Sequence, residues 1–68
     1  MPLVQVTMIA GRTLAQKHEL IKRLTEATAE VLEADPQRVR VVLYEVSGDD
    51  WGVGGEPVSK LRAPKAAE

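Results

Sequence analysis

The segment that most constrains this chain is residues 14–33, where apolar side chains recur at the spacing of an amphipathic helix. The recurring positions are Leu14, Ile21, Leu24, Thr28 and then Val31 or Leu32, with Leu20 and Ala27 widening the stripe. Thr13 precedes this segment and Gln16 follows three residues later, which fits a capping box at a helix start. Asp35 stands before Pro36, and because a residue before proline avoids the helical region, the helix is expected to end there.

The segments on either side of this helix have the pattern of β-strands. Residues 3–9 alternate, with Val4, Val6 and Met8 on one face, and residues 39–46 are rich in β-branched side chains. Strand, helix and strand in this order predict an α/β fold, a single β-α-β unit. Its two strands should lie parallel through a right-handed crossover.

The last third of the chain changes character. Residues 47–57 form a glycine-rich loop around Trp51, the only tryptophan. Residues 58–62 are predicted to form a short edge strand or one arm of a C-terminal hairpin. We therefore expect one domain over residues 2–62, with residues 63–68 as a flexible C-terminal tail.

The small size of the chain predicts assembly with partner subunits. A chain of 68 residues rarely buries enough apolar surface alone, and a two-stranded sheet is marginal by itself. No cysteine is present and there is one histidine, so disulfides and a multi-histidine metal site within one chain are excluded. Pairing of subunits is the remaining way to stabilise the fold, and an active site shared between subunits is then expected.

Charge and hydropathy restrict the classes of partner that the chain is expected to bind. The formal net charge is -1, with 9 basic and 10 acidic residues, which favours neither a nucleic acid nor an acidic membrane. No apolar run is long enough to span a bilayer, and the first residues do not resemble a secretory signal. A soluble, cytoplasmic protein is the expectation.

Several polar groups give only weak indications of a site. His18 stands between Lys17 and Glu19 off the apolar stripe, so a solvated surface position is favoured. Adjacent Asp49 and Asp50 could ligate a divalent ion, but two neighbouring carboxylates in a loop are more often structural. Residues 52–55 are glycine-rich without the lysine and helix start of a phosphate loop, which favours a tight hairpin.

Pro2, Arg12 and Arg40 are the stronger candidates for chemistry. Initiator methionine is expected to be removed before a small residue, and Pro2 would then carry a free secondary amine that can act as a base. Arg12 follows the turn at the end of the first strand, and Arg40 stands among the valines of the second, on the same face as Val42 and Tyr44. An arginine presents a planar fork that fits a carboxylate at two points. A proline suited to a strand start, and arginines in surface or intersubunit salt bridges, are the alternatives.

Taken together, these residues resemble the 4-oxalocrotonate tautomerase family of the tautomerase superfamily over residues 2–62. The shared features are Met1-Pro2 before a short strand, Gly11-Arg12 before the helix, Val39-Arg40-Val41 at the second strand, Trp51-Gly52-Val53-Gly54-Gly55-Glu56, and Ser59-Lys60. The resemblance implies a β-α-β subunit that pairs into a four-stranded dimer, with dimers forming a homohexamer or, alternatively, a heterohexamer. It also implies that neighbouring subunits contribute residues to each site.

The resemblance further implies the activity and the roles of the residues. The family ketonises dienols such as 2-hydroxymuconate to α,β-unsaturated ketones without cofactor or metal. Pro2 would be the catalytic base, and Arg12 and Arg40 would bind a small dicarboxylate or keto/enol acid and assist catalysis. Trp51 would wall the site in place of the usual phenylalanine. Ile9 and Arg38 complete the implied substrate-binding set, Arg38 adding a positive charge where a small polar residue is common.

Two other classes of function stay open at this point. The first is a different reaction on the same scaffold: dehalogenation, hydration or decarboxylation. Val53 argues against the first two, because it stands where the related trans-3-chloroacrylic acid dehalogenase has a water-activating glutamate. The second is a non-catalytic oligomeric binding module, which the joint presence of Pro2, Arg12 and Arg40 disfavours. The physiological substrate, and a role in aromatic-compound degradation or in biosynthesis, are not decided by the sequence.

Overall fold

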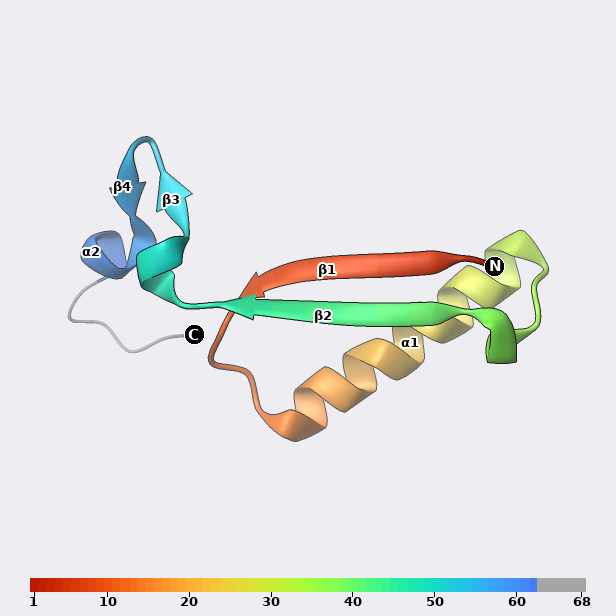
Figure 1. Ribbon diagram of the computed structural model, residues 1–68. Helices are drawn as coiled ribbons and strands as arrows, with labels where there is room; N and C mark the ends of the chain where they lie inside the picture. Colours follow the sequence, from red (N-terminus) through yellow and green to blue (C-terminus); the bar gives the residue numbers. More distant parts are fainter. Residues whose placement is uncertain (63–68) are drawn as a thin grey trace.

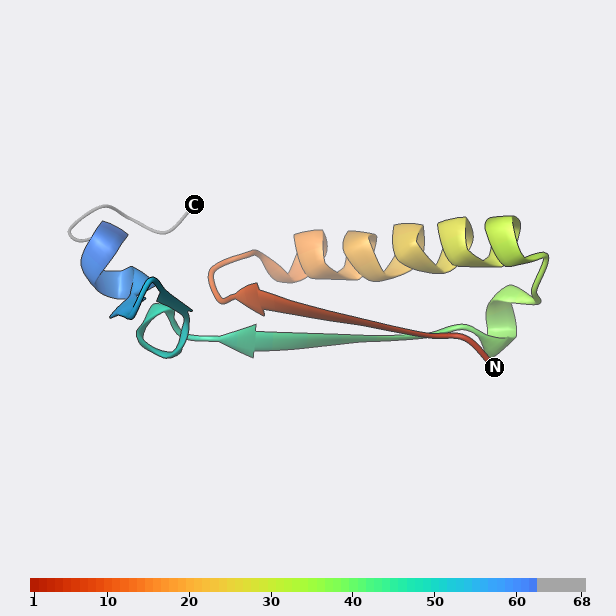
Figure 2. The same ribbon diagram turned by 90° about the horizontal axis from the view of Figure 1, so that it is seen from above.

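The β-α-β unit is present as predicted. The structure, a computed structural model, describes residues 1–62, and the tail predicted at 63–68 lies outside the described residues. The strands β1 (Leu3–Ile9) and β2 (Arg40–Val46) pair in parallel, and helix α1 (Leu14–Leu32) connects them (Figure 1). Seen from above, α1 covers one face of the sheet along its length (Figure 2). Residues 1–62 leave the opposite face of the sheet open.

The ends of α1 are fixed by contacts that the sequence predicted. The Gln16 backbone N–H donates to Thr13 Oγ1 at 3.0 Å, and the Thr13 N–H donates to Gln16 Oε1 at 3.0 Å, which completes the capping box. The helix ends at Leu32, and its C-cap residue Glu33 takes a left-handed conformation with φ 54°. A short 3-10 turn, η1 (Pro36–Arg38), follows, and the Val39 N–H closes it by donating to the Pro36 carbonyl at 3.2 Å. Strand β2 therefore begins at Arg40, one residue later than predicted.

The helix stripe is less buried than its apolar pattern predicted. Leu20, Ile21, Leu24 and Thr28 are half-buried, whereas Ala27 is exposed and Ala29 is the buried alanine. The helix ends also show large apolar side chains: Leu14 is 64%, Val31 78% and Leu32 59% exposed. A stripe that one strand pair cannot cover agrees with the expectation that this chain needs a partner.

The register of the sheet sorts the strand residues onto two faces. Val4, Val6 and Met8 of β1 lie opposite Val41, Leu43 and Glu45 of β2, and these rows face α1. The rows on the open face are Leu3, Gln5, Thr7 and Ile9 beside Arg40, Val42, Tyr44 and Val46. The Gln5 amide donates to the Tyr44 hydroxyl at 3.1 Å across this open face. Each face follows the two-residue period that the sequence showed.

The C-terminal arm, residues 47–62, extends beyond the carboxyl end of β2 (Figure 1). It contains the 3-10 turn η2 (Gly48–Asp50), an antiparallel hairpin of β3 (Gly52–Val53) and β4 (Glu56–Pro57), and helix α2 (Val58–Arg62). The predicted hairpin is confirmed, with Gly54 and Gly55 at its tip in positive-φ conformations. Helix α2 packs against η2 and β4.

The prediction of a strand or hairpin arm over residues 58–62 is wrong, because this segment is α2. Pro57 has no backbone N–H to continue the ladder, so β4 ends there, and proline suits the position before a helix. Val58 is only 7% exposed, and its N–H donates to the Trp51 carbonyl at 2.7 Å. Burial of Val58 against the arm thus favours the helix α2, which the local sequence pattern did not predict.

Candidate active site

The amino end of the sheet holds Pro2, Arg38 and Arg40. The Arg40 backbone N–H donates to the Pro2 carbonyl at 3.0 Å, which places the two residues side by side on neighbouring chain segments. The Arg40 guanidinium folds back over η1, where Nη1 donates to the Gln37 carbonyl at 2.9 Å. Arg38 is the last residue of η1, and its side chain is exposed. Two guanidinium groups therefore stand at the end of the sheet that carries the proline.

The carboxyl end of the sheet holds Ile9, Arg12 and Trp51. Ile9 ends β1, and the Ala10 N–H donates to the Val46 carbonyl at 2.8 Å, which carries the pairing one residue further. Arg12 follows Gly11, whose φ of 135° is one that L side chains rarely adopt. Trp51 follows η2 at the start of the arm and is half-buried. The predicted placement of Arg12 after the turn is confirmed.

These two groups of residues lie at opposite ends of one subunit. Strand β1 runs between them, and its seven residues span about 20 Å at about 3.3 Å per residue. One chain consequently brings Pro2 together with Arg38 and Arg40, and Arg12 together with Ile9 and Trp51, but does not join the two groups. A site that uses Pro2 and Arg12 on the same small substrate requires a second copy of the chain.

The three candidate arginines form no ion pair within residues 1–62 and are available to bind a ligand. Within residues 1–62, two side-chain ion pairs form, Lys17–Glu45 and Arg23–Glu19, and neither includes Arg12, Arg38 or Arg40. The Arg23 guanidinium donates to Glu19 at 2.7 Å and holds the pKa of Glu19 below its ordinary value, while Glu19 raises that of Arg23. An arginine without a carboxylate neighbour is available to an anionic substrate.

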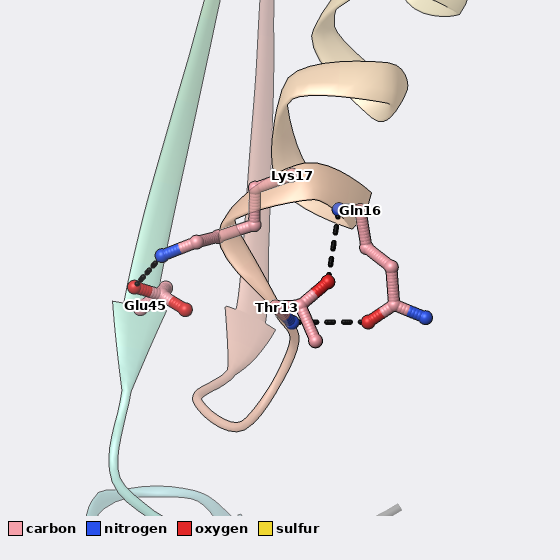
Figure 3. Close-up of polar contacts among 4 residues, drawn as sticks. All are labelled: Thr13, Gln16, Lys17 and Glu45. Atoms are coloured by element: carbon pink, nitrogen blue, oxygen red, sulfur yellow. Dashed lines mark hydrogen bonds and ion pairs between the residues drawn. The ribbon is translucent and has the colours of Figure 1, made fainter.

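The Lys17–Glu45 pair was missed by the reasoning from sequence. Lys17 Nζ lies 2.9 Å from Glu45 Oε1 and joins the first turn of α1 to the end of β2 (Figure 3). Lys17 also lines a hollow of about 250 Å³ together with Arg12, Met8, Gln16 and Leu20. One indication was present in the sequence: Glu45 interrupts the apolar row that Val41 and Leu43 begin.

The weaker candidates have structural surroundings. His18 is exposed and borders a second hollow, between α1 and the Leu43 and Glu45 side chains. Asp49 accepts a short hydrogen bond from the Ser59 hydroxyl, and its N–H donates to Ser47 Oγ at 2.9 Å, so it holds the arm together. Across the part of the chain that the structure describes, no group of three or more His, Cys, Asp or Glu side chains gathers as metal ligands would. No helix among those residues is long and apolar enough to cross a membrane.

Comparison with known proteins identifies what this arrangement is similar to. Residues 2–61 match the family described as tautomerase enzyme. A 2-hydroxymuconate tautomerase from Pseudomonas sp. (strain CF600) is 47% identical over 62 residues, which cover 91% of this chain and 98% of that protein.

Solved structures share the fold. A heterohexamer 4-oxalocrotonate tautomerase from Chloroflexus aurantiacus J-10-fl superposes with a TM-score of 0.86 at 37% identity, covering 91% of this chain and 100% of that one. TomN, a 4-oxalocrotonate tautomerase homologue in the tomaymycin biosynthetic pathway, superposes with a TM-score of 0.89 at 35% identity, covering 96% and 100%. These matches extend over nearly the whole length of the subunit.

Proposed function

The chain belongs to the tautomerase family and is an isomerase, and we propose that it ketonises small anionic dienols of the 2-hydroxymuconate type with a free amino-terminal Pro2 as general acid and base. The observation that carries this proposal is the 47% identity to a 2-hydroxymuconate tautomerase over 98% of that protein. The availability of Arg12, Arg38 and Arg40 for anions supports it, since none forms an ion pair within residues 1–62.

The base in this proposal is the Pro2 nitrogen after Met1 is removed. Met1 is 79% exposed, so the bond that precedes Pro2 is accessible for cleavage. The amine must be largely neutral near pH 7 to take the enol proton, and positive charge nearby disfavours its protonated form. A guanidinium at about 6.5 Å contributes roughly 2.5 kcal/mol at an effective dielectric near 20, which lowers the pKa of the amine. We propose Arg40, whose backbone N–H bonds the Pro2 carbonyl, as the source of this charge.

The reaction is a proton transfer within one substrate. Pro2 takes the enol O–H proton, the oxygen lone pair forms the ketone C=O, and the conjugated double bonds shift. The protonated amine then returns its proton to a distant carbon. No electron leaves or enters the substrate, so the step needs no oxidant or reductant.

The arginines bind the two ends of the substrate in this scheme. Arg40 holds one carboxylate and the adjacent oxygen, where its charge stabilises the developing enolate. Arg12 holds the far carboxylate and draws electron density toward the carbon that is protonated. Trp51 and Ile9 form apolar walls around the planar chain of the substrate, and Arg38 adds a cation beside Arg40.

The separation of Pro2 from Arg12 supports a site shared between subunits. One copy supplies Pro2, while Arg12 and Trp51 come from the carboxyl end of a neighbouring copy. We propose a homohexamer, built from dimers with a four-stranded sheet, with a heterohexamer as the alternative because the Chloroflexus protein is one. The substrate pathway and a cytoplasmic location stay predictions, and TomN shows that a homologue serves biosynthesis.

The test is the pH dependence of 2-hydroxymuconate turnover by mature protein whose intact mass shows loss of Met1. We expect turnover with a limb between about pH 6 and 7.5, and its loss in a matched preparation that retains Met1. Equal turnover with and without Met1 would exclude Pro2 as the base. Absence of turnover from an assembled, processed protein would exclude this substrate and favour another reaction or a non-catalytic binding role.

A further inference from the structure

The connector between β1 and α1, residues 10–13, lies between two contacts with β2. At its start, the Ala10 N–H donates to the Val46 carbonyl at 2.8 Å. Four residues past its end, in the first turn of α1, Lys17 Nζ bonds Glu45 Oε1 at 2.9 Å. The two anchors fall on consecutive residues of β2. Arg12 lies between them, so its position depends on both.

The second anchor acts on a stiff piece of helix. The capping box joins Thr13 and Gln16 in both directions (Figure 3). The Lys17 N–H also donates to the Thr13 carbonyl at 3.0 Å. A displacement of Lys17 therefore also displaces Thr13, the residue that follows Arg12. Arg12 and Lys17 also border the same hollow of about 250 Å³. The first anchor uses backbone atoms alone. The Lys17–Glu45 pair is formed by side chains, so it is the anchor that a substitution can remove.

Comparison with the other ion pair indicates that this one has more than a surface role. The side chains of Lys17 and Glu45 are 23% and 32% exposed, whereas those of Arg23 and Glu19 are 75% and 50% exposed. Arg23–Glu19 links neighbouring turns of one helix, while Lys17–Glu45 links residues 28 positions apart. Attraction between charges strengthens as water is excluded, so the shielded pair fixes geometry more firmly.

We propose that the Lys17–Glu45 pair is a positioning pair that holds Arg12 where it meets the far carboxylate of the substrate. The pair touches no substrate in this scheme and acts only through the residue 10–13 connector. This inference rests on the proposed function for its kinetic consequence, but its structural part concerns Arg12 alone. It also explains why Glu45, a carboxylate, follows Val41 and Leu43 in the row of β2 that faces α1.

The proposal is tested by steady-state kinetics of two variants, Glu45→Gln and Lys17→Met. Each is measured on a dicarboxylate dienol and on an enol monocarboxylate. For the dicarboxylate we expect KM to rise about tenfold in each variant with kcat nearly unchanged, below the roughly hundredfold loss that follows a misplacement of about 1 Å. For the monocarboxylate we expect no change, because Arg12 has no far carboxylate to hold. The charge-reversed double variant Lys17→Glu/Glu45→Lys should recover much of the lost affinity. Glu19→Gln, which removes the other ion pair, is the matched control.

Two outcomes would overturn the proposal. One is an unchanged KM for the dicarboxylate in both variants, and the other is an equal loss of activity for both substrates, which would indicate a general structural defect.

A second measurement is independent of turnover. The Nε–Hε NMR signal of Arg12, assigned with Arg12→Lys, should shift or broaden in Glu45→Gln and stay unchanged in Glu19→Gln. If the wild-type protein turns over neither substrate, the proposed function fails while this signal still decides the positioning role. An unchanged Arg12 signal in Glu45→Gln would refute that role.

Discussion

At the amino end of the sheet Pro2 and Arg40 are joined directly through backbone atoms, whereas at the carboxyl end the positions of Arg12 and Trp51 depend on neighbouring side chains as well as on backbone bonds. The Arg40 N–H reaches the Pro2 carbonyl as one more rung of the β1–β2 ladder. The carboxyl end has the Ala10–Val46 and Val58–Trp51 backbone bonds, and side chains add to them. The capping box and the Lys17–Glu45 pair lie beside Arg12, and the Ser59–Asp49 bond closes the arm that carries Trp51. Backbone pairing survives most substitutions, while side-chain contacts do not. The proposed base is thus held by backbone pairing, whereas Arg12 and Trp51 are held in part by side chains that a substitution can remove.

The amino end should show the largest effect on chemistry. Arg40→Ala removes the guanidinium proposed to stabilise the enolate but keeps the backbone bond to Pro2, so we expect kcat to fall by about 100- to 1000-fold. Steady-state kinetics on 2-hydroxymuconate measure this, and Arg38→Ala, two residues away, is the control with a smaller expected loss. An unchanged kcat in Arg40→Ala would remove Arg40 from the proposed mechanism.

The carboxyl end should affect binding more than chemistry. For Arg12→Ala we expect KM for the dicarboxylate to rise roughly tenfold to hundredfold, because one two-point contact to a carboxylate is lost. Mixing this variant with Arg40→Ala and reassembling the subunits tests the shared site. If Arg12 and Pro2–Arg40 come from different copies, some mixed sites contain neither substitution and regain activity. A mixture no more active than its components would place all these residues within one subunit's site.

The parts of the fold that were predicted correctly depend on local pattern, and the part that was not depends on contacts between distant residues. Strand β1 and the capping box of Thr13 and Gln16 follow from spacing that the sequence displays. Helix α2 was predicted as a strand because its conformation depends on burial of Val58 and its bond to Trp51. The sequence predicts Pro2, Arg12 and Arg40 as site residues, and this stays a prediction, while the parallel register shows that they divide between the two ends of the sheet. The Lys17–Glu45 pair joins residues 28 positions apart, which local spacing does not reveal.

The arm offers a finer test of how the carboxyl end is held. Ser59→Ala removes the hydroxyl that donates to Asp49, and we expect the arm to lose about 1 kcal/mol of local stability, the usual net contribution of such a bond. Fluorescence of Trp51, the only tryptophan, reports this directly as a shift toward a more solvated environment. Ser47→Ala, which removes the η2 cap, is the matched variant on the same arm. An unchanged Trp51 spectrum in both would show that the hairpin and Val58 alone fix this residue.

The smallest effect is expected from the ion pair that belongs to neither end. Arg23 holds the pKa of Glu19 below its ordinary value, chiefly through their hydrogen bond. A carboxylate whose folded pKa is lowered adds stability above its unfolded pKa and loses it as the pH falls through the folded value. Thermal unfolding of wild type and Glu19→Gln should therefore differ slightly at neutral pH and converge in acid, the exposed pair being screened by water and salt. Glu45→Gln should give the larger difference at neutral pH, because its pair is more shielded. If Glu19→Gln destabilises the protein more than Glu45→Gln does, shielding is not what sets the strength of the anchor beside Arg12.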